Sequence, residues 1–155
     1  MNYETNRIKD LIRRHYDGET WHGPSLIETL SDVSHEQAVK RLLPNTHNIA
    51  EIVAHLTNWR VFVLEKLTGG DTYDIVLDSE ADWLRFDSLT LEQWHDLLVS
   101  LADTHAELLD VMEAVNDRRL NDIVPGRKYS YYILLHGGIQ HEIYHSGQIS
   151  LLKKV

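Results

Sequence analysis

Apolar residues recur every three or four positions along most of this chain, which is the spacing of amphipathic α-helices. The first such pattern covers residues 8–15 and predicts a helix that Gly18 ends. A longer pattern covers residues 49–67 and stops at Gly69-Gly70, a typical helix end. These two segments predict long helices in the first half of the chain.

Two further long helices are predicted nearer the C-terminus. Apolar residues from Trp94 to Met112 follow the helical spacing, Pro125-Gly126 then interrupts the chain, and a last helical pattern reaches Leu152. Residues that cap helix N-termini precede three of the long helices: Asn48 with Glu51, Thr90 with Gln93, and Ser130.

The remaining segments are short or aperiodic. Residues 26–30 and 34–38 are typical of short helical segments, and the acidic stretch 71–87 is the longest connection. Strand-like alternation is nowhere sustained. We therefore predict an all-α protein, a four-helix bundle with one long crossover loop and short extra helical segments, formed by one domain over residues 1–155.

Composition excludes several classes of function. The chain has no cysteine, so a cysteine nucleophile, a redox dithiol and a zinc site built on thiolates are excluded. A formal net charge of -9 with scattered Lys and Arg argues against a nucleic-acid partner. No apolar run approaches the length of a membrane span, and the polar start of the sequence lacks a signal-like apolar core, so we expect a cytoplasmic protein without a membrane partner.

The most informative motif is the pair His141 and His145, which are four residues apart in a helical context. Two imidazoles at this spacing lie one turn apart on one helix face and can bind one metal ion. With Glu142 the motif also spells the zinc-peptidase pattern H-E-x-x-H, which needs a third ligand downstream. The ten residues that follow contain no His, Asp, Glu or Cys, so the peptidase interpretation fails.

The candidate third ligand is upstream, at His55. Helical spacing places it beside the apolar stripe that contains Trp59, so it faces inward. An inward histidine alone is more often a hydrogen-bonded core residue, but its combination with the pair on another helix favours a metal ligand. Five other histidines we assign to the protein surface: His15, His22, His35, His95 and His105.

Other polar residues near these histidines have alternative roles. Gln148, one turn after His145, can hydrogen-bond a ligand histidine or a backbone group, and His47 can line the mouth of a pocket or lie in solvent. Trp59 belongs either to the core or to the pocket wall. Glu142 and Glu51 are the candidates for a proton-transferring residue, although helix capping is the first role expected of Glu51.

The adjacent glycines 137 and 138 lie on the same helix face as the histidine pair. Glycine inside a helix costs about 1 kcal/mol relative to alanine, so another contribution must offset this cost. Close helix packing and space for a ligand beside the metal are the two explanations, and the sequence leaves both open.

In three segments the chain resembles the DinB-like, YfiT-related metal-binding bundles: residues 21–26, 47–59 and 135–149. The resemblance extends over essentially the whole chain. It implies that His55 supplies one metal ligand from the second long helix, while His141 and His145 supply two from the fourth. It also implies zinc or nickel as the metal, and a homodimer.

Three neutral imidazoles suit zinc or nickel and leave coordination positions open, which is typical of a catalytic site. The resemblance favours a thiol-dependent S-transferase that uses a low-molecular-weight thiol to attack a small electrophilic molecule, in detoxification or stress response. The alternatives are a metal-dependent hydrolase with a metal-bound water, and a metal-binding or sensing module without turnover.

Overall fold

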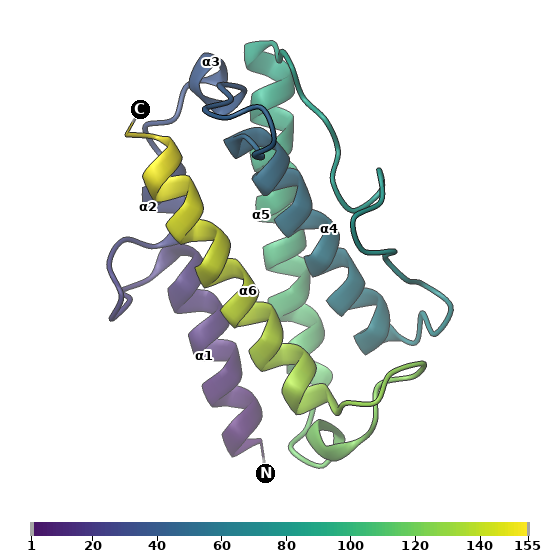
Figure 1. Cartoon of the computed structure of the whole chain (residues 1–155). Helices are drawn as coiled ribbons and strands as arrows, with labels where there is room; N and C mark the ends of the chain where they lie inside the picture. The colour runs from purple at the N-terminus through teal and green to yellow at the C-terminus, as the bar shows by residue number, and fades with distance from the viewer. Residues whose placement is uncertain (1, 155) are drawn as a thin grey trace.

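The computed structural model describes residues 2–154, and within this range the regular structure is helical (Figure 1). The four long helices are α1 (Tyr3–Asp17), α4 (Ile49–Thr68), α5 (Leu91–Ala114) and α6 (Tyr131–Leu152). Three short helices complete the described part: α2 (Leu26–Leu30), α3 (His35–Ala38) and the 3-10 helix η1 (Arg119–Asn121). The predicted all-α class and the helical bundle are confirmed.

The chain direction makes one long connection necessary. Helices α1 and α6 run in one direction and α4 and α5 in the other, so residues 69–90 return the chain along the bundle before α5 begins (Figure 1). Helix α4 packs on α5 and α6, and α1 packs on the same two helices. The predicted crossover loop is therefore present, and it lies beside α4.

The helix ends follow the predicted caps with one exception. The side chain of Asn48 accepts a hydrogen bond from the backbone of Glu51, whose carboxylate accepts one from the backbone of Asn48, and Thr90 forms the same capping box with Gln93. Gly69 ends α4 in the left-handed region with φ 99°. Ser130 is the N-cap residue of α6, as predicted, but its side chain makes no capping hydrogen bond.

The core consists of two apolar clusters, with polar side chains between them. One cluster includes Ile12, Phe62, Leu108 and Leu135, and the other includes Leu56. Each long helix carries histidines or charged residues where it passes from one cluster to the other: His15 on α1, His55 and Arg60 on α4, His105 on α5, and His141, Glu142 and His145 on α6. This polar layer contains the candidate site.

None of the helices within residues 2–154 combines the length and the apolar character that a membrane span requires.

Candidate metal centre

The structure brings His55, His141 and His145 together at the contact between α4 and α6. The Nε2 atom of His141 lies 3.0 Å from Nε2 of His55 and 3.1 Å from Nε2 of His145. The three ring centroids are separated by 4.5 to 5.0 Å. Three nitrogen ligands in tetrahedral zinc sites, with Zn–N bonds of about 2 Å, are separated by about 3.3 Å, so this arrangement suits a metal ion.

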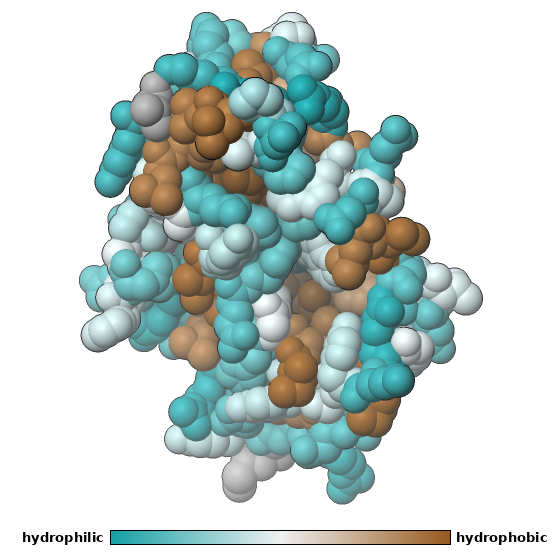
Figure 2. Space-filling view, viewed as in Figure 1, coloured by the Kyte–Doolittle hydropathy of each residue, from teal (hydrophilic) through white to brown (hydrophobic). Residues whose placement is uncertain are grey.

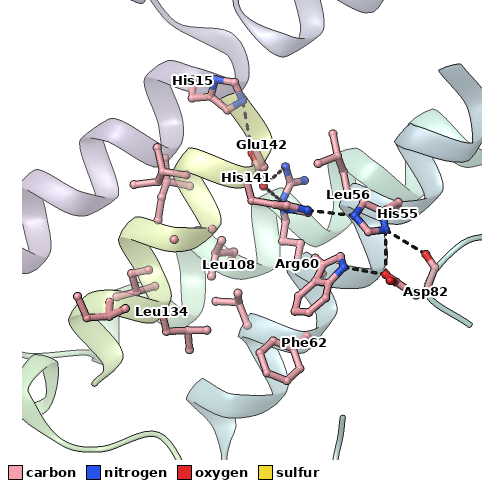
Figure 3. Close-up of a pocket in the computed structure, with 18 of the residues that line it drawn as sticks. His15, His55, Leu56, Arg60, Phe62, Asp82, Leu108, Leu134, His141 and Glu142 are labelled. Atoms are coloured by element: carbon pink, nitrogen blue, oxygen red, sulfur yellow. Dashed lines mark hydrogen bonds and ion pairs between the residues drawn. The ribbon is translucent and has the colours of Figure 1, made fainter. Parts of the chain in front are cut away.

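The opposite ring nitrogens fix the orientation of two of these histidines. His55 Nδ1 donates to the backbone carbonyl of Asp82 at 3.0 Å and lies 2.9 Å from the carboxylate of the same residue (Figure 3). His145 Nδ1 donates to the side-chain oxygen of Gln148 at 2.6 Å. A neutral imidazole has one N–H and one lone pair, so both Nε2 atoms present their lone pairs to the centre of the trio.

The donor set therefore fits a cation better than a hydrogen-bonded cluster. If His141 carries its proton on Nε2, this N–H can donate to the lone pair of only one neighbouring histidine. The lone pair of the other histidine then points at a nitrogen without receiving a hydrogen bond. A divalent cation accepts a lone pair from each of the three rings at once. The hydrogen-bonding pattern of the trio thus supports the same conclusion as its distances.

Burial keeps these imidazoles neutral, which is the form that binds a metal. Burial, together with the neighbouring rings of His145 and His55, lowers the pKa of His141 to about 3. Burial also lowers the pKa of His55, although the hydrogen bond to Asp82 opposes this shift, and it lowers the pKa of His145 against the opposing effect of Gln148.

A segment of the crossover loop covers one side of the site. The Trp83 ring stacks on His55 with centroids 3.7 Å apart, and His47 stacks on the other face of Trp83 at 3.6 Å. Asp82 also accepts a hydrogen bond from Trp59 Nε1 at 2.9 Å. Trp59 thus orients the loop residue that orients His55, and the exposed His47 stacks on Trp83 outside the trio.

The two candidate proton-transferring carboxylates have other partners in the structure. Both Nε and Nη2 of the buried Arg60 donate to Glu142 Oε1, at 3.0 and 2.8 Å, and the other Glu142 oxygen faces His15 (Figure 3). Glu51 caps α4 and forms an ion pair with Arg41. A catalytic role for Glu142 or Glu51 stays a prediction, because the observed contacts of both are structural.

A cavity of about 540 Å³ adjoins the trio. His55 and His141 form part of its wall, together with Trp59, and most of the remaining lining is apolar side chains, including Phe62 and Leu134 (Figure 3). Binding sites for small molecules have volumes in this range and combine apolar walls with a few polar groups. The cation position would therefore face a space in which a small molecule fits.

The assignment of His15 and His105 to the surface is wrong. His15 is 3% exposed and lines the cavity, and His105 is 5% exposed and stacks on Tyr16. Both lie on the inner faces of α1 and α5, where the helical pattern already placed apolar neighbours. The other three follow the prediction more closely, with His22 and His95 exposed and His35 partly exposed.

The sequence did not identify three residues of the site: Arg60, Asp82 and Trp83. Arg60 could have been found, because a charged residue within the apolar stripe of α4 requires a buried partner. Asp82 and Trp83 lie in an aperiodic connection, where no local pattern indicates which side chains turn inward.

Comparison with known proteins supports the resemblance stated from the sequence. No curated protein and no solved structure matches the chain. The family model of the DinB superfamily matches residues 20–149, a range that contains His55, His141 and His145. This match covers most of the chain, which therefore belongs to the DinB superfamily.

Proposed function

We propose that this protein is a metal-dependent enzyme, and specifically a thiol-dependent S-transferase that acts on small electrophilic molecules. The observation that carries the proposal is the convergence of three neutral imidazoles, two of which, His55 and His141, lie in the wall of a cavity large enough for a small molecule. The ligands we assign are His55, His141 and His145, with zinc or nickel as the metal, and we expect the protein to be a homodimer.

When bound, a divalent cation with an open coordination position lowers the pKa of a thiol or a water molecule in that position. In the transferase reaction the thiolate sulfur attacks the electrophilic carbon, a C–S bond forms, and the leaving group departs with the electrons of the broken bond. The thiol proton passes to the solvent. The residues of this chain hold the imidazoles in place, through Asp82 and Gln148, and exclude water from one side of the site through Trp83.

The contacts of the nearby carboxylates favour a thiol over water as the nucleophile. A metal-bound water is less acidic than a metal-bound thiol, and a carboxylate base that accepts its proton assists its attack. Among residues 2–154, Glu142 is bound by Arg60 and Asp82 by His55 and Trp59, so each of these carboxylates already has hydrogen-bond donors. A thiol bound to a metal is deprotonated outright, so it depends less on such a base.

Metal analysis of purified variants tests the site. We expect about one equivalent of zinc or nickel in the wild-type protein, and loss of most of it in His55→Ala and His145→Ala. His47→Ala is the matched control, because this residue also stacks on Trp83 but lies outside the trio, and it should keep its metal. Undiminished metal in both ligand variants would reject the assignment.

A thermal-shift screen followed by a turnover assay tests the reaction. Metal-loaded protein is screened with glutathione, bacillithiol and mycothiol, and the thiol that raises the melting temperature is then assayed with monochlorobimane. We expect a thioether product with the wild-type protein and none above background with His55→Ala. Metal and thiol binding without product would instead identify a sensing module, and hydrolysis of an ester substrate without thiol would identify a hydrolase.

A further inference from the structure

The two adjacent glycines of α6 keep the cavity open. Both Gly137 and Gly138 line it. A Cβ atom added at Gly137 would have no neighbouring atom within 4 Å, and one added at Gly138 would meet only Val63, at 3.9 Å. Close helix packing therefore does not explain these glycines, and of the two explanations that the sequence left open, the structure favours space beside the trio.

The cavity wall carries no unpaired cation within the described residues. The guanidinium of Arg60 donates to Glu142 and, at 2.6 Å, to the backbone carbonyl of Leu101, so its charge is paired and each of its three nitrogens makes a hydrogen bond. Burial lowers the pKa of His15, which leaves this imidazole neutral at pH 7. When a thiol occupies the open position of a metal held by the trio, an anionic ligand would lose its hydration in this cavity without gaining a cationic partner.

The mouth of the cavity carries two large apolar side chains beside the exposed Asp78. Leu77 of the crossover loop and Ile133 of α6 both line the cavity, although their side chains are 69% and 53% exposed. Figure 2 shows hydrophobic residues at the bottom of a hollow between α6 and the crossover loop. Exposed apolar side chains at the rim of an apolar cavity favour entry of a molecule with an apolar surface.

We propose that the cavity binds the electrophilic substrate, that this substrate is uncharged with an apolar alkyl or aryl body, and that Gly137 determines how large that body can be. This inference rests on the proposed transferase function, because it assigns the cavity to the electrophile and leaves the open metal position to the thiol. The apolar body lies along Gly137 and Gly138, and the electrophilic carbon faces His55 and His141.

Isothermal titration calorimetry on the metal-loaded protein, saturated with the thiol selected in the thermal-shift screen, tests the ligand class directly. Butylbenzene and 4-phenylbutanoate have similar apolar bodies and differ in charge. We expect butylbenzene to bind and 4-phenylbutanoate to bind at least about tenfold more weakly, because its carboxylate finds no cation in the cavity other than the metal, whose open position the thiol occupies. Equal affinity for the two probes, or preference for the anion, would overturn the inference.

Gly137→Leu tests the role of the glycine, and Gly147→Leu is the matched control. Gly147 lies in the same helix, is exposed, and also has no atom within 4 Å of an added Cβ. We expect Gly137→Leu to weaken butylbenzene binding about tenfold or more, whereas Gly147→Leu leaves the affinity unchanged. Unchanged affinity in both variants would reject Gly137 as the size-determining residue.

A smaller substitution covers the case in which Gly137→Leu does not fold. Gly137→Ala adds one methyl group where the structure has space, so it should fold and melt at a higher temperature than the wild type. We expect its relative affinity to shift from butylbenzene toward the shorter toluene, and an unshifted ratio would contradict the inference.

Metal analysis of the same samples separates the two proposals. If the wild-type protein retains its metal and its thiol-transfer activity but does not bind butylbenzene, only the apolar substrate class is rejected. Wild-type protein that takes up no zinc or nickel but binds butylbenzene rejects the metal-dependent transferase and leaves an apolar binding site.

Discussion

The residues that touch the outer nitrogens of the histidine trio control how well it can bind a metal. Gln148 accepts a hydrogen bond from His145 at 2.6 Å, and Asp82 accepts one from His55. These contacts select the tautomer that presents Nε2 to the centre, and they hold the ring planes against rotation.

We predict that Gln148→Ala weakens metal affinity about 10- to 100-fold without abolishing binding, because the three ligands remain but one of them loses its orientation. Competition with a chromophoric chelator measures the affinity. Gln140→Ala, an exposed position of the same helix, is the control and should bind like the wild type. An unchanged affinity in Gln148→Ala would assign the hydrogen bond no role in the site.

His105 gives the folded protein a sensitivity to acid that does not involve the metal ligands. Burial lowers its pKa from 6.5 to about 4, and the charge of Arg60 and the neighbouring His15 lower it in the same direction. Between these two pH values the unfolded chain binds a proton at this residue that the folded protein does not bind. The contribution of His105 to the free energy of unfolding is therefore fully present above pH 6.5, and it decreases as the pH falls toward 4.

We predict that His105→Phe, which keeps a ring stacked on Tyr16, loses less stability between pH 7 and pH 4 than the wild type. The difference should be at most about 3 kcal/mol, which corresponds to the size of the pKa shift. Urea unfolding at several pH values measures it. His95→Phe, at an exposed position of the same helix, should follow the wild-type curve, and an identical curve for His105→Phe would refute the prediction.

At the scale of elements, the ion pair between Arg60 and Glu142 connects α4 to α6, and a further hydrogen bond from Arg60 reaches α5. The side chain of Arg60 is 1% exposed and that of Glu142 is 13% exposed. In such surroundings, removal of one partner leaves an uncompensated charge, whereas removal of both leaves none.

We predict that Arg60→Met lowers the free energy of unfolding by about 3 to 5 kcal/mol. The double variant Arg60→Met with Glu142→Leu should regain a large part of this loss, because no buried charge is left unpaired. Urea unfolding of both single variants and the double variant forms a double-mutant cycle. Additive losses in the double variant would show that the two side chains act independently.

At the scale of the whole molecule, a bound metal would connect α4 to α6 through His55 on one side and His141 with His145 on the other. A ligand that binds only the folded state stabilises it, and the bundle presents the three nitrogens together only when these helices are packed. Metal binding and the stability of the bundle are therefore linked.

We predict that zinc or nickel at about 100 times its dissociation constant raises the free energy of unfolding by about 2.7 kcal/mol, and that EDTA reverses this gain. Differential scanning calorimetry of metal-loaded and EDTA-treated protein measures the shift. His55→Ala should melt at the same temperature in both conditions. An equal shift in that variant would mean that the metal stabilises the fold at another site.

Much of the fold could be predicted from local patterns. The apolar spacing in residues 49–67 and the capping pair Asn48 and Glu51 predict α4 almost to its observed ends, because both depend on residues within one or two helical turns. The same holds for His141 and His145, since the spacing of four alone places them on one face of α6. The missing cap at Ser130 had no such local indication.

The histidine trio depends both on local helix patterns and on the packing of helices against each other. The inward direction of His55 follows from its helix, but its distance to His141 depends on how α4 packs against α6. The family resemblance supplied that link where residue spacing did not. The buried positions of His15 and His105 were missed because a histidine is compatible with either face of a helix, and only the partners across the bundle decide between them.

The sequence by itself determined the helices, most of their ends and the shared helix face of His141 and His145, because these depend on interactions between residues close together in the chain. Only the tertiary structure decided that Asp82 and Trp83 of the crossover loop close one side of the site, that Arg60 neutralises Glu142, and that Gly137 borders a cavity. The physical reason is that each of these features joins segments far apart in the chain, where packing and burial, rather than local periodicity, select the partner.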